Sequence, residues 1–357
     1  MASLEDLPIR DDLRGRKPYG APQLNVPVAL NVNENTHRIP EGVAIDVVAA
    51  IAAALIDINR YPDREFTKLR SALATYLGDG MKEENIWAAN GSNEVMLQIF
   101  QAFGGPSRKA LGFGPTYSMY SLLALTTGTD YVDLPRGEKF ELNSELVVEA
   151  IAKHQPSIVM LCSPNNPTGT PLSLSVIEAA YDATDGIIVV DEAYAEFGSG
   201  ESAISLLESR PRLLISRTMS KAFAFAGARL GYLAADPAAI DALRLVRLPY
   251  HLSALTQAAA TAALNHSALM LKTVEDIQYQ RDRMSLELAE LGFEVFRSEA
   301  NFLLFSGLKD SAEAFDQLLA QGVLVRNVGI PHTLRVTAGT EAETRRFLEA
   351  AQKLVKL

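Results

Sequence analysis

Short, continuously apolar stretches that alternate with helical patterns are the feature that most constrains how this chain folds. Between about residue 44 and residue 250 these stretches read NIWAAN, KALGFG, SIVMLC, GIIVVDEAY, LLISRT and LGYLAA. Strands that are apolar without alternation are buried on both faces, as in sheets that helices cover on both sides. The pattern therefore predicts an α/β fold with a central sheet between layers of helices.

The pattern changes near residue 251. Long helical stretches rich in alanine and leucine come first, followed by FEVFRS, NFLLFS, GVLVRNV and TLRVTAG and by a closing helical stretch. This order predicts a smaller α+β unit after the large one. We expect an arm with part of the small domain in residues 1–43, a large α/β domain in 44–250 and a small α+β domain in 251–357. The arm, rich in proline, glycine and charge, is expected to lie over the body.

Charge and composition exclude several classes of function. A net charge of −10 over 357 residues disfavours nucleic acid and anionic membranes as partners. The single cysteine, Cys162, rules out a disulfide framework, and the five histidines lack metal-ligand spacing, so no metal is expected. The apolar residues 44–58 include two aspartates and are fewer than the roughly 18–20 of a membrane span, so they predict a buried helix. Because the N-terminus shows no apolar leader, we expect a cytoplasmic protein.

Two polar motifs follow apolar strands in the large unit. Asp191 ends the stretch GIIVVD, with Tyr194 three residues later, and Asn166 stands in the turn SPNNPTG after SIVMLC. Ligands of open α/β sheets bind at the carboxyl ends of strands, where Asp191 is expected; a carboxylate at that place can in general hold a cation or a metal, or bond a ring N–H. The alternatives are a helix cap or an acid paired with an arginine for Asp191, and local backbone contacts for Asn166.

Two further motifs suit an anion and a reactive amine. Ser92 and Asn93 follow a glycine at the predicted start of a helix, where free N–H groups suit a phosphate, although Ser92 also suits an ordinary N-cap. Lys221 follows LLIS and the hydroxyls of Thr218 and Ser220. A lysine that condenses with a carbonyl must stand in a partly desolvated site or near other cations.

Arg229 follows that lysine eight residues later. Its permanent charge suits a phosphate, with the nearby hydroxyls as neutral donors. The alternative is a surface lysine with a structural arginine. No single motif decides between these interpretations, but the four motifs together, in this order, are specific.

In this order the motifs resemble the aminotransferases of fold type I that depend on pyridoxal 5′-phosphate, and most of all the histidinol-phosphate aminotransferases. The resemblance runs from LNVNEN near residue 30 to LRVTAGT near residue 335 and includes KPYGAP, NRYPD, GPTYSMY, SPNNPTG and SRTMSKAFAFAGARLGY. It implies a large domain with a mostly parallel sheet, a smaller α+β domain and pyridoxal 5′-phosphate as cofactor.

The resemblance also implies a role for each motif residue at the cofactor ring. Lys221 would bond to the cofactor's aldehyde and carry protons, and Asp191 would pair with the protonated pyridine nitrogen. Tyr194 and Asn166 would bond the phenolic oxygen of the ring. Tyr117 would stack on the ring face, or else be a core aromatic.

The phosphate and substrate contacts are implied in the same way. The residues implied for the cofactor phosphate are Arg229, Ser220, Thr218, Ser92 and Asn93. Tyr61 resembles the tyrosine that reaches the neighbouring subunit's cofactor, which implies a homodimer with shared active sites; otherwise it is a turn aromatic. Arg335 would bind the acidic end of the amino donor. Arg326 and Tyr19 would contact the phosphate end, or else be a solvated arginine and an arm-packing tyrosine.

The resulting hypothesis is a transamination of small molecules. L-histidinol phosphate and 2-oxoglutarate would give imidazole-acetol phosphate and L-glutamate, a step of histidine biosynthesis. An aromatic amino-acid aminotransferase and a threonine-phosphate decarboxylase have nearly the same scaffold and stay open as alternatives. A non-catalytic regulator that binds pyridoxal 5′-phosphate is disfavoured, because this acidic chain shows no basic module for reading DNA.

Overall fold

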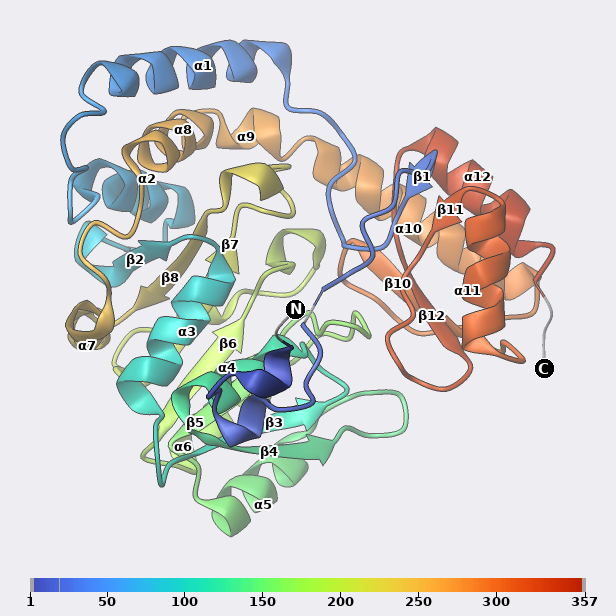
Figure 1. Cartoon of the computed structure of the whole chain (residues 1–357), viewed down its shortest axis with the longest axis horizontal. Coiled ribbons are helices and arrows are strands. Elements are labelled where there is room, and N and C mark those ends of the chain that lie inside the picture. Colours follow the sequence, from blue (N-terminus) through green and yellow to red (C-terminus); the bar gives the residue numbers. More distant parts are fainter. Residues whose placement is uncertain (1–2, 19, 355–357) are drawn as a thin grey trace.

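A seven-stranded sheet forms the centre of the molecule (Figure 1). The computed structural model describes residues 3–18 and 20–354. The strand order is β2-β8-β7-β6-β5-β3-β4. The strands are β2 (Ile86–Ala89), β3 (Lys109–Gly114), β4 (Asp130–Pro135), β5 (Ile158–Cys162), β6 (Ile187–Asp191), β7 (Leu213–Thr218) and β8 (Gly231–Ala235).

The sheet is parallel from β4 through β3, β5 and β6 to β7, and β8 runs antiparallel to both β7 and β2. All six apolar stretches form strands, so the predicted α/β sheet is confirmed. The sequence did not indicate β4, because this edge strand reads DYVDLP and is mostly exposed or half-buried. A sheet edge does not demand the continuous apolar run that marks an inner strand.

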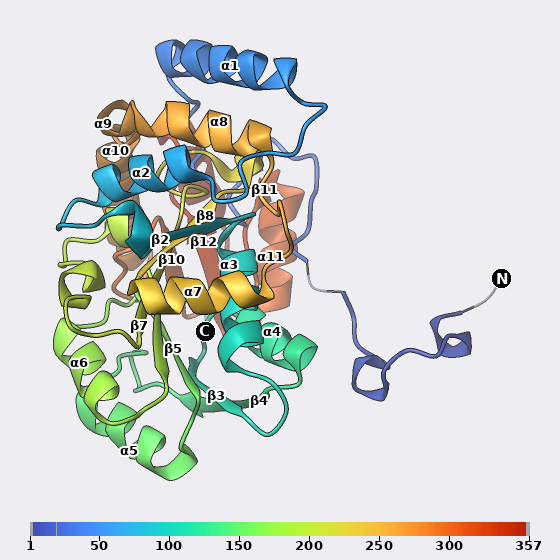
Figure 2. The same cartoon turned by 90° about the vertical axis from the view of Figure 1, so that its left-hand side faces the viewer.

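Helices cover both faces of this sheet, with α5 and α6 on one side and α3 and α7 on the other (Figure 2). The helices of this part are α2 (Thr67–Leu77), α3 (Ser92–Phe103), α4 (Met119–Thr127), α5 (Ser144–His154), α6 (Leu174–Asp182) and α7 (Pro237–Val246). Short 3₁₀ helices are η1 (Leu4–Asp6), η2 (Asp11–Leu13), η3 (Glu83–Asn85), η4 (Ala195–Phe197), η5 (Ala203–Leu206) and η6 (Ala226–Ala228). The inner strands are buried along most of their length, which places the core between the two helix layers.

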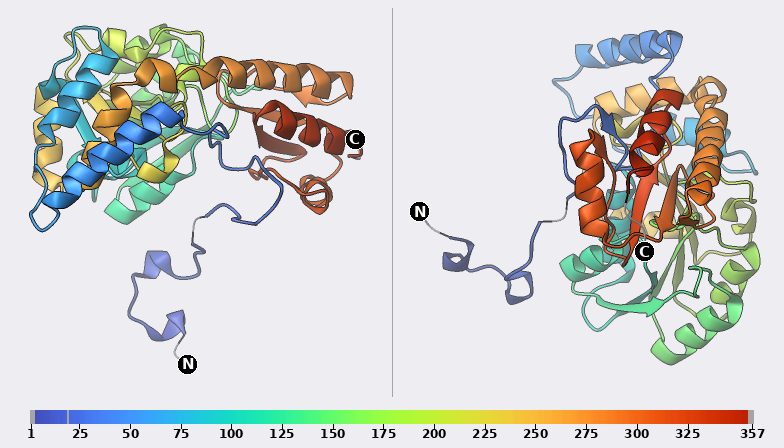
Figure 3. Two further views of the ribbon diagram at one scale, coloured as in Figure 1. Left: turned by 90° about the horizontal axis from the view of Figure 1, so that it is seen from above. Right: turned by 90° about the vertical axis from the view of Figure 1, so that its right-hand side faces the viewer.

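The C-terminal part is built on an antiparallel sheet of order β12-β10-β9. Its strands are β9 (Glu294–Val295), β10 (Phe302–Ser306) and β12 (Thr333–Thr337). The helices that follow residue 250 are α8 (Ala254–Leu264), α9 (Ser267–Met270), α10 (Thr273–Glu290), α11 (Ser311–Ala320) and α12 (Glu341–Ala351). Figure 3 shows α10 running from the large sheet to the small one.

A parallel pair of two-residue strands joins the N-terminal segment to this part. β1 (Val28–Ala29) pairs with β11 (Val323–Leu324). The segment before the first long helix thus pairs with the C-terminal part. The division at residues 43 and 250 stays a prediction.

The helix α1 (Glu41–Ile56) corrects one expectation. The sequence predicts a buried helix here, but in the single chain only Val43 and Val47 are buried, whereas Ile56 is 80% exposed. The prediction is wrong because α1 packs mainly on α8 at the periphery and leaves its other apolar side uncovered (Figure 2). Among the described residues, no helix combines the length and the apolar character that crossing a membrane requires.

The N-terminal arm also differs from expectation. Its described residues before Val26 are mostly exposed, and they project away from the body instead of lying over it (Figures 2 and 3). Arg10 touches the body by donating hydrogen bonds to the carbonyls of Leu125, at 3.0 Å, and Thr126, at 3.4 Å. The arm is charged and has too few apolar side chains to pack stably on the body of the chain.

Replacing Phe305 on β10 tests the core of the C-terminal part. Its ring is fully buried and meets Phe293 and Phe347 at centroid distances of 5.5 and 6.1 Å. Phe305→Ala is expected to lower the free energy of unfolding by about 3–5 kcal/mol, because it leaves a cavity. Urea titration followed by circular dichroism measures the change. The control is Leu286→Ala, at a side chain 68% exposed, and equal losses in both variants would contradict the placement of this core.

Candidate active site

A cavity of about 390 Å³ opens at the carboxyl ends of β5, β6 and β7. Residues from the C-terminal part and from the segment before α1 complete its wall. The predicted site residues that line it are Ser92, Asn93, Tyr117, Asn166, Asp191, Tyr194, Thr218, Ser220, Lys221, Arg229, Arg326 and Arg335. Tyr61 does not line it, and Tyr19 lies outside the described residues.

Lys221 lies just after β7 with its amine inside the cavity. Its Nζ donates a hydrogen bond to the carbonyl of Val32 at 3.0 Å and lies 5.9 Å from the ring centroid of Tyr194. Burial, with the Arg335 guanidinium nearby, lowers the pKa of Lys221 to about 8. On the order of a tenth of this amine is therefore neutral at pH 7 and available as a nucleophile or a base, far more than for an ordinary lysine.

Asp191 is the last residue of β6 and is 4% exposed. Its Oδ2 accepts the O–H of Tyr120 at 2.7 Å, and its Oδ1 accepts the N–H of Ala193 at 3.3 Å. Burial raises the pKa of Asp191 to about 6. The arginine pairing considered for this acid falls on its neighbour instead, because Glu192 binds Arg217 at 2.7 Å. The Asp191 carboxylate is thus left facing the cavity.

Tyr194, Asn166 and Arg335 form one hydrogen-bonded chain. The amide of Asn166 contacts the Tyr194 hydroxyl at 3.4 Å, and its Oδ1 accepts from Nη1 of Arg335 at 2.6 Å. Asn33 donates to the same hydroxyl at 3.0 Å, and Nη2 of Arg335 donates to the carbonyl of Asn31 at 2.8 Å. The Asn166 side chain therefore connects distant parts of the chain and does more than close its own turn.

Arg326 and Arg335 lie side by side on the cavity wall. Their backbones form a two-residue antiparallel bridge, with reciprocal N–H···O bonds of 2.9 Å. Nη2 of Arg326 also donates to the carbonyl of Gly20 at 3.4 Å. Two arginines on one cavity wall favour ligands with an anionic end.

The start of α3 forms a second anion-binding region. A Cβ added at Gly91 would lie 2.5 Å from Nη2 of Arg229, and one added at Gly231 would lie 2.0 Å from the backbone nitrogen of Ser92. Gly91 has φ +85°, a conformation that favours glycine. Only glycines let the arginine and β8 approach the helix start this closely, so the free N–H groups and the guanidinium stand together.

Hydroxyl groups complete this region. The Thr218 and Ser220 hydroxyls lie 3.0 Å apart, and the Tyr117 hydroxyl donates to Oδ1 of Asn93 at 3.1 Å. Neutral donors, helix N–H groups and one guanidinium form a donor set that suits a phosphate ester.

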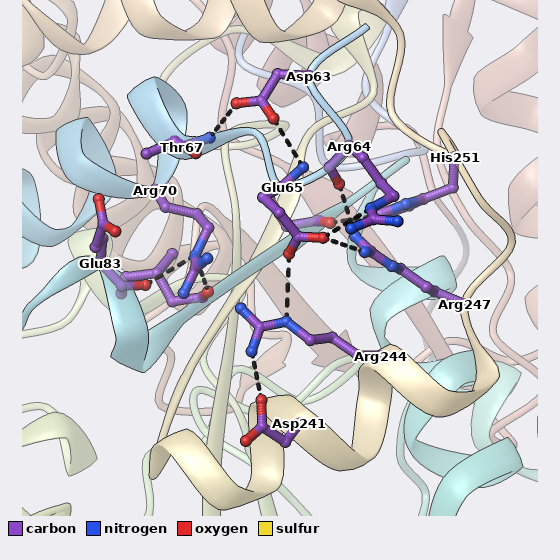
Figure 4. Close-up of polar contacts among 12 residues, drawn as sticks. Asp63, Arg64, Glu65, Thr67, Arg70, Glu83, Asp241, Arg244, Arg247 and His251 are labelled. Atoms are coloured by element: carbon purple, nitrogen blue, oxygen red, sulfur yellow. Dashed lines mark hydrogen bonds and ion pairs between the residues drawn. The ribbon is translucent and has the colours of Figure 1, made fainter. Parts of the chain in front are cut away.

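Tyr61 points outward from the body of the chain. It is 80% exposed and stacks on Tyr250 with ring centroids 4.4 Å apart. Figure 4 shows how the following loop is held: Glu65 accepts from Arg247 and lies 3.3 Å from Nε of Arg244. These ion pairs anchor the loop that follows Tyr61 to the end of α7, so they restrict the position of Tyr61.

Three residues of the site were missed by the sequence analysis. Asn31 and Asn33 line the cavity from the loop between β1 and α1, and Tyr120 binds Asp191. The two asparagines alternate within LNVNEN, so period-two spacing would have put them on one side of the chain. Tyr120 follows Tyr117 by three residues in GPTYSMY, which is a helical spacing.

Known proteins resemble this chain over nearly its whole length. The model of the family described as aminotransferase class I and II matches residues 26–350. The histidinol-phosphate aminotransferase of Paenarthrobacter aurescens (strain TC1) is 58% identical over 99% of this chain and 96% of its own. That of Thermobifida fusca (strain YX) is 53% identical over 98% and 95%. The crystal structure of histidinol-phosphate aminotransferase from Sinorhizobium meliloti in complex with pyridoxal-5′-phosphate has a TM-score of 0.83 at 25% identity, covering 92% of this chain and 90% of that one.

The lowered pKa of Lys221 makes a measurable prediction. Reductive methylation of the cofactor-free protein, followed by peptide mass spectrometry across a pH series, is expected to reach half its maximum rate at Lys221 near pH 8. Only the neutral amine reacts, so the rate rises as pH increases through the pKa. The exposed Lys82 serves as the reference site. Half-maximal reaction near the ordinary lysine pKa of about 10.4 would contradict the desolvated environment.

Proposed function

The chain belongs to the class I and II aminotransferase family, and from that membership we propose that it transfers the amino group of L-histidinol phosphate to 2-oxoglutarate. The products would be imidazole-acetol phosphate and L-glutamate. The observation that carries the proposal is the convergence of Lys221, Asp191 and the adjacent pair Arg326 and Arg335 in one cavity. The names of the similar aminotransferases support the substrate.

We propose pyridoxal 5′-phosphate as the cofactor, because the donors on this cavity fit it. Arg229, Ser220 and the N–H groups at the start of α3 would hold its phosphate, and Asp191 would hold a proton on its ring nitrogen. Lys221 would anchor its aldehyde carbon. When bound, the cofactor supplies an aldehyde that carries the amino group and an electron-poor ring that makes the substrate's Cα–H bond acidic.

Lys221 would perform the proton transfers. With a pKa of about 8, its Nζ can take the proton from Cα of the amino donor and later return one to Cα of the glutamate product. Asp191, held by Tyr120, would keep a negative charge opposite the ring nitrogen. Tyr194 and Asn166 would donate to the ring oxygen, and their contacts with Asn33 and Arg335 fix both groups in place.

Arg326 and Arg335 would bind the anionic end of each substrate. One substrate ends in a phosphate and the other in a carboxylate, so a single pocket must accept both. A guanidinium offers a planar fork of N–H groups that suits either anion. The hydrogen bonds of Arg335 to Asn166 and Asn31 orient its plane before a substrate arrives.

We also propose a homodimer in which Tyr61 completes the partner subunit's phosphate site. Apolar side chains exposed on α1 and around the end of α7 support this proposal: Ile45, Val48, Leu55, Ile56, Leu245 and Leu248. Large apolar side chains exposed in this number are typical of a protein interface. Tyr61 does not line its own cavity and is held outward by Tyr250 and the Glu65 ion pairs.

A panel of amino donors tests the function. The purified protein with pyridoxal 5′-phosphate and 2-oxoglutarate is expected to form L-glutamate with L-histidinol phosphate at a higher kcat/KM than with L-phenylalanine. Lys221→Ala should lower kcat by about 10³-fold or more, because the proton-transfer group is lost, while cofactor binding persists in part.

Other outcomes of this panel point elsewhere. A preference for L-phenylalanine would favour an aromatic amino-acid aminotransferase, and release of carbon dioxide from O-phosphothreonine would favour a decarboxylase. Full activity of Lys221→Ala would contradict the proposed chemistry.

Hybrid dimers test the shared site. Tyr61→Phe is expected to weaken cofactor binding about tenfold or more, because a hydrogen bond to a charged phosphate is lost. A hybrid of one Lys221→Ala subunit and one Tyr61→Phe subunit should show about half of the parent activity with parent cofactor affinity. Its only lysine-bearing site would receive Tyr61 from the other subunit.

The control for this experiment is Tyr279→Phe, at a tyrosine 67% exposed on α10. It should bind cofactor like the parent. If the hybrid binds cofactor as weakly as the Tyr61→Phe homodimer, Tyr61 serves its own subunit and the shared site is refuted.

A further inference from the structure

We propose that Tyr120 is a positioning residue that keeps Asp191 in its carboxylate form and aims it into the cavity. The inference deepens the proposed function, because it concerns the acid opposite the cofactor ring. It rests on a direct contact between two buried side chains and on the absence of any other hydroxyl donor to Asp191 among the contacts recorded in the described part of the chain.

The geometry of the contact is that of a strong hydrogen bond. The Tyr120 side chain is fully buried, and its O–H donates to Oδ2 of Asp191 at 2.7 Å. Oδ1 accepts the backbone N–H of Ala193 at the longer distance of 3.3 Å. Each carboxylate oxygen can accept two hydrogen bonds, so the group keeps capacity for a donor in the cavity that it lines.

The start of α4 positions two tyrosines that have different roles, Tyr117 and Tyr120. Tyr117 stands just before α4 and lines the cavity, whereas Tyr120 lies in the first turn of α4 and reaches the end of β6. Their rings meet edge to face, with centroids 5.6 Å apart and an angle of 87°. Any shift of α4 would therefore move the cavity wall and the hydroxyl on Asp191 together.

Because Asp191 is buried, it needs the Tyr120 hydroxyl to stay in its carboxylate form. A carboxylate without water is disfavoured relative to its protonated form, and a donated hydrogen bond offsets that penalty. Burial raises the pKa of Asp191 to about 6, whereas the hydrogen bond from Tyr120 acts in the opposite direction. Without the hydroxyl, Asp191 would hold its proton at a higher pH and could no longer accept a proton-bearing ring nitrogen.

The other titratable groups around Asp191 do not replace Tyr120. Cys162 lies opposite Asp191 in the β5–β6 register, and burial raises its pKa to about 12, so it stays a neutral thiol. Glu192 follows Asp191 in the chain and pairs with Arg217. Lys221 lines the same cavity and donates to the carbonyl of Val32. The partner of Asp191 in the β6–β7 register, Ser216, is uncharged.

A purely structural tyrosine would behave differently from a positioning residue. If Tyr120 only fills space and satisfies its own hydroxyl, Tyr120→Phe will lower stability but leave the titration of Asp191 unchanged. If it holds the carboxylate, the same change will move that titration upward. The pH dependence therefore separates the two roles.

The test compares Tyr120→Phe with Tyr131→Phe in the full-length holoenzyme. Tyr131 is a half-buried tyrosine on the edge strand β4, which β3 and β5 separate from β6, so it serves as the control. In Tyr120→Phe the acidic limb of kcat/KM is expected to shift upward by about one pH unit or more. Activity is then lost at a higher pH, because the carboxylate is protonated earlier as pH falls. The KM for the donor should change less than about twofold.

A second measurement does not depend on activity. Infrared titration of the cofactor-free protein follows the protonated carboxyl band of Asp191, identified by its loss in Asp191→Asn. The band should appear near pH 6 in the parent and about one unit or more higher in Tyr120→Phe. Replacing Tyr120 with 3-fluorotyrosine keeps the hydroxyl, strengthens it as a donor and should shift the band downward.

The outcomes decide the inference independently of the substrate. An unshifted band and an unshifted pH profile in Tyr120→Phe would overturn it, and so would an equal shift in Tyr131→Phe. If Tyr120→Phe fails to fold, an unshifted band in the 3-fluorotyrosine protein would overturn it. An inactive parent protein would count against the proposed transamination, while the infrared titration would still decide the role of Tyr120.

Discussion

Removal of charged groups from water at the carboxyl edge of the parallel sheet is the constraint on which this site depends. The same burial raises the pKa of Asp191 to about 6 and lowers that of Lys221 to about 8. Both shifts bring the groups toward the neutral range, where a proton can leave or arrive at little cost. The sheet produces this effect because inner parallel strands are covered on both faces, so side chains at their ends have little access to solvent.

The surrounding contacts direct these two groups. Tyr120 donates to Asp191 from α4, and Arg335 lies near enough to Lys221 to help lower its pKa. Arg335 comes from β12, whereas Lys221 follows β7, so the electrostatics of the lysine depend on how the two sheets are arranged. The segment before α1 also contributes to the site, because Asn33 donates a hydrogen bond to Tyr194, 161 residues further along the sequence. A site with parts from both sheets suits a cofactor and a substrate that meet between them.

Sequence motifs predicted the residues that lie close to strand ends. Lys221, Asp191 and Asn166 each follow an apolar strand within a few residues, and strand ends meet at one edge of a parallel sheet. Tyr120 was not predicted, because its role depends on the reach of a side chain from α4 to β6. The pairing of Arg326 with Arg335 was not predicted either, because it depends on how the loop between them turns and brings their backbones together. Family resemblance supplied the roles of these residues, and neither periodicity nor spacing would have done so.

The sequence by itself determined the apolar strands of the large sheet, because continuous apolar runs are local patterns. The sequence also supplies glycine at positions 91 and 231, where a side chain would collide with Arg229 or with the start of α3. Only the tertiary structure decided that α1 exposes apolar side chains, that the N-terminal arm projects away from the rest of the chain, and that Tyr61 faces outward. Burial and direction depend on which surfaces meet in space, and a one-dimensional pattern records the apolar character of a residue without recording what covers it.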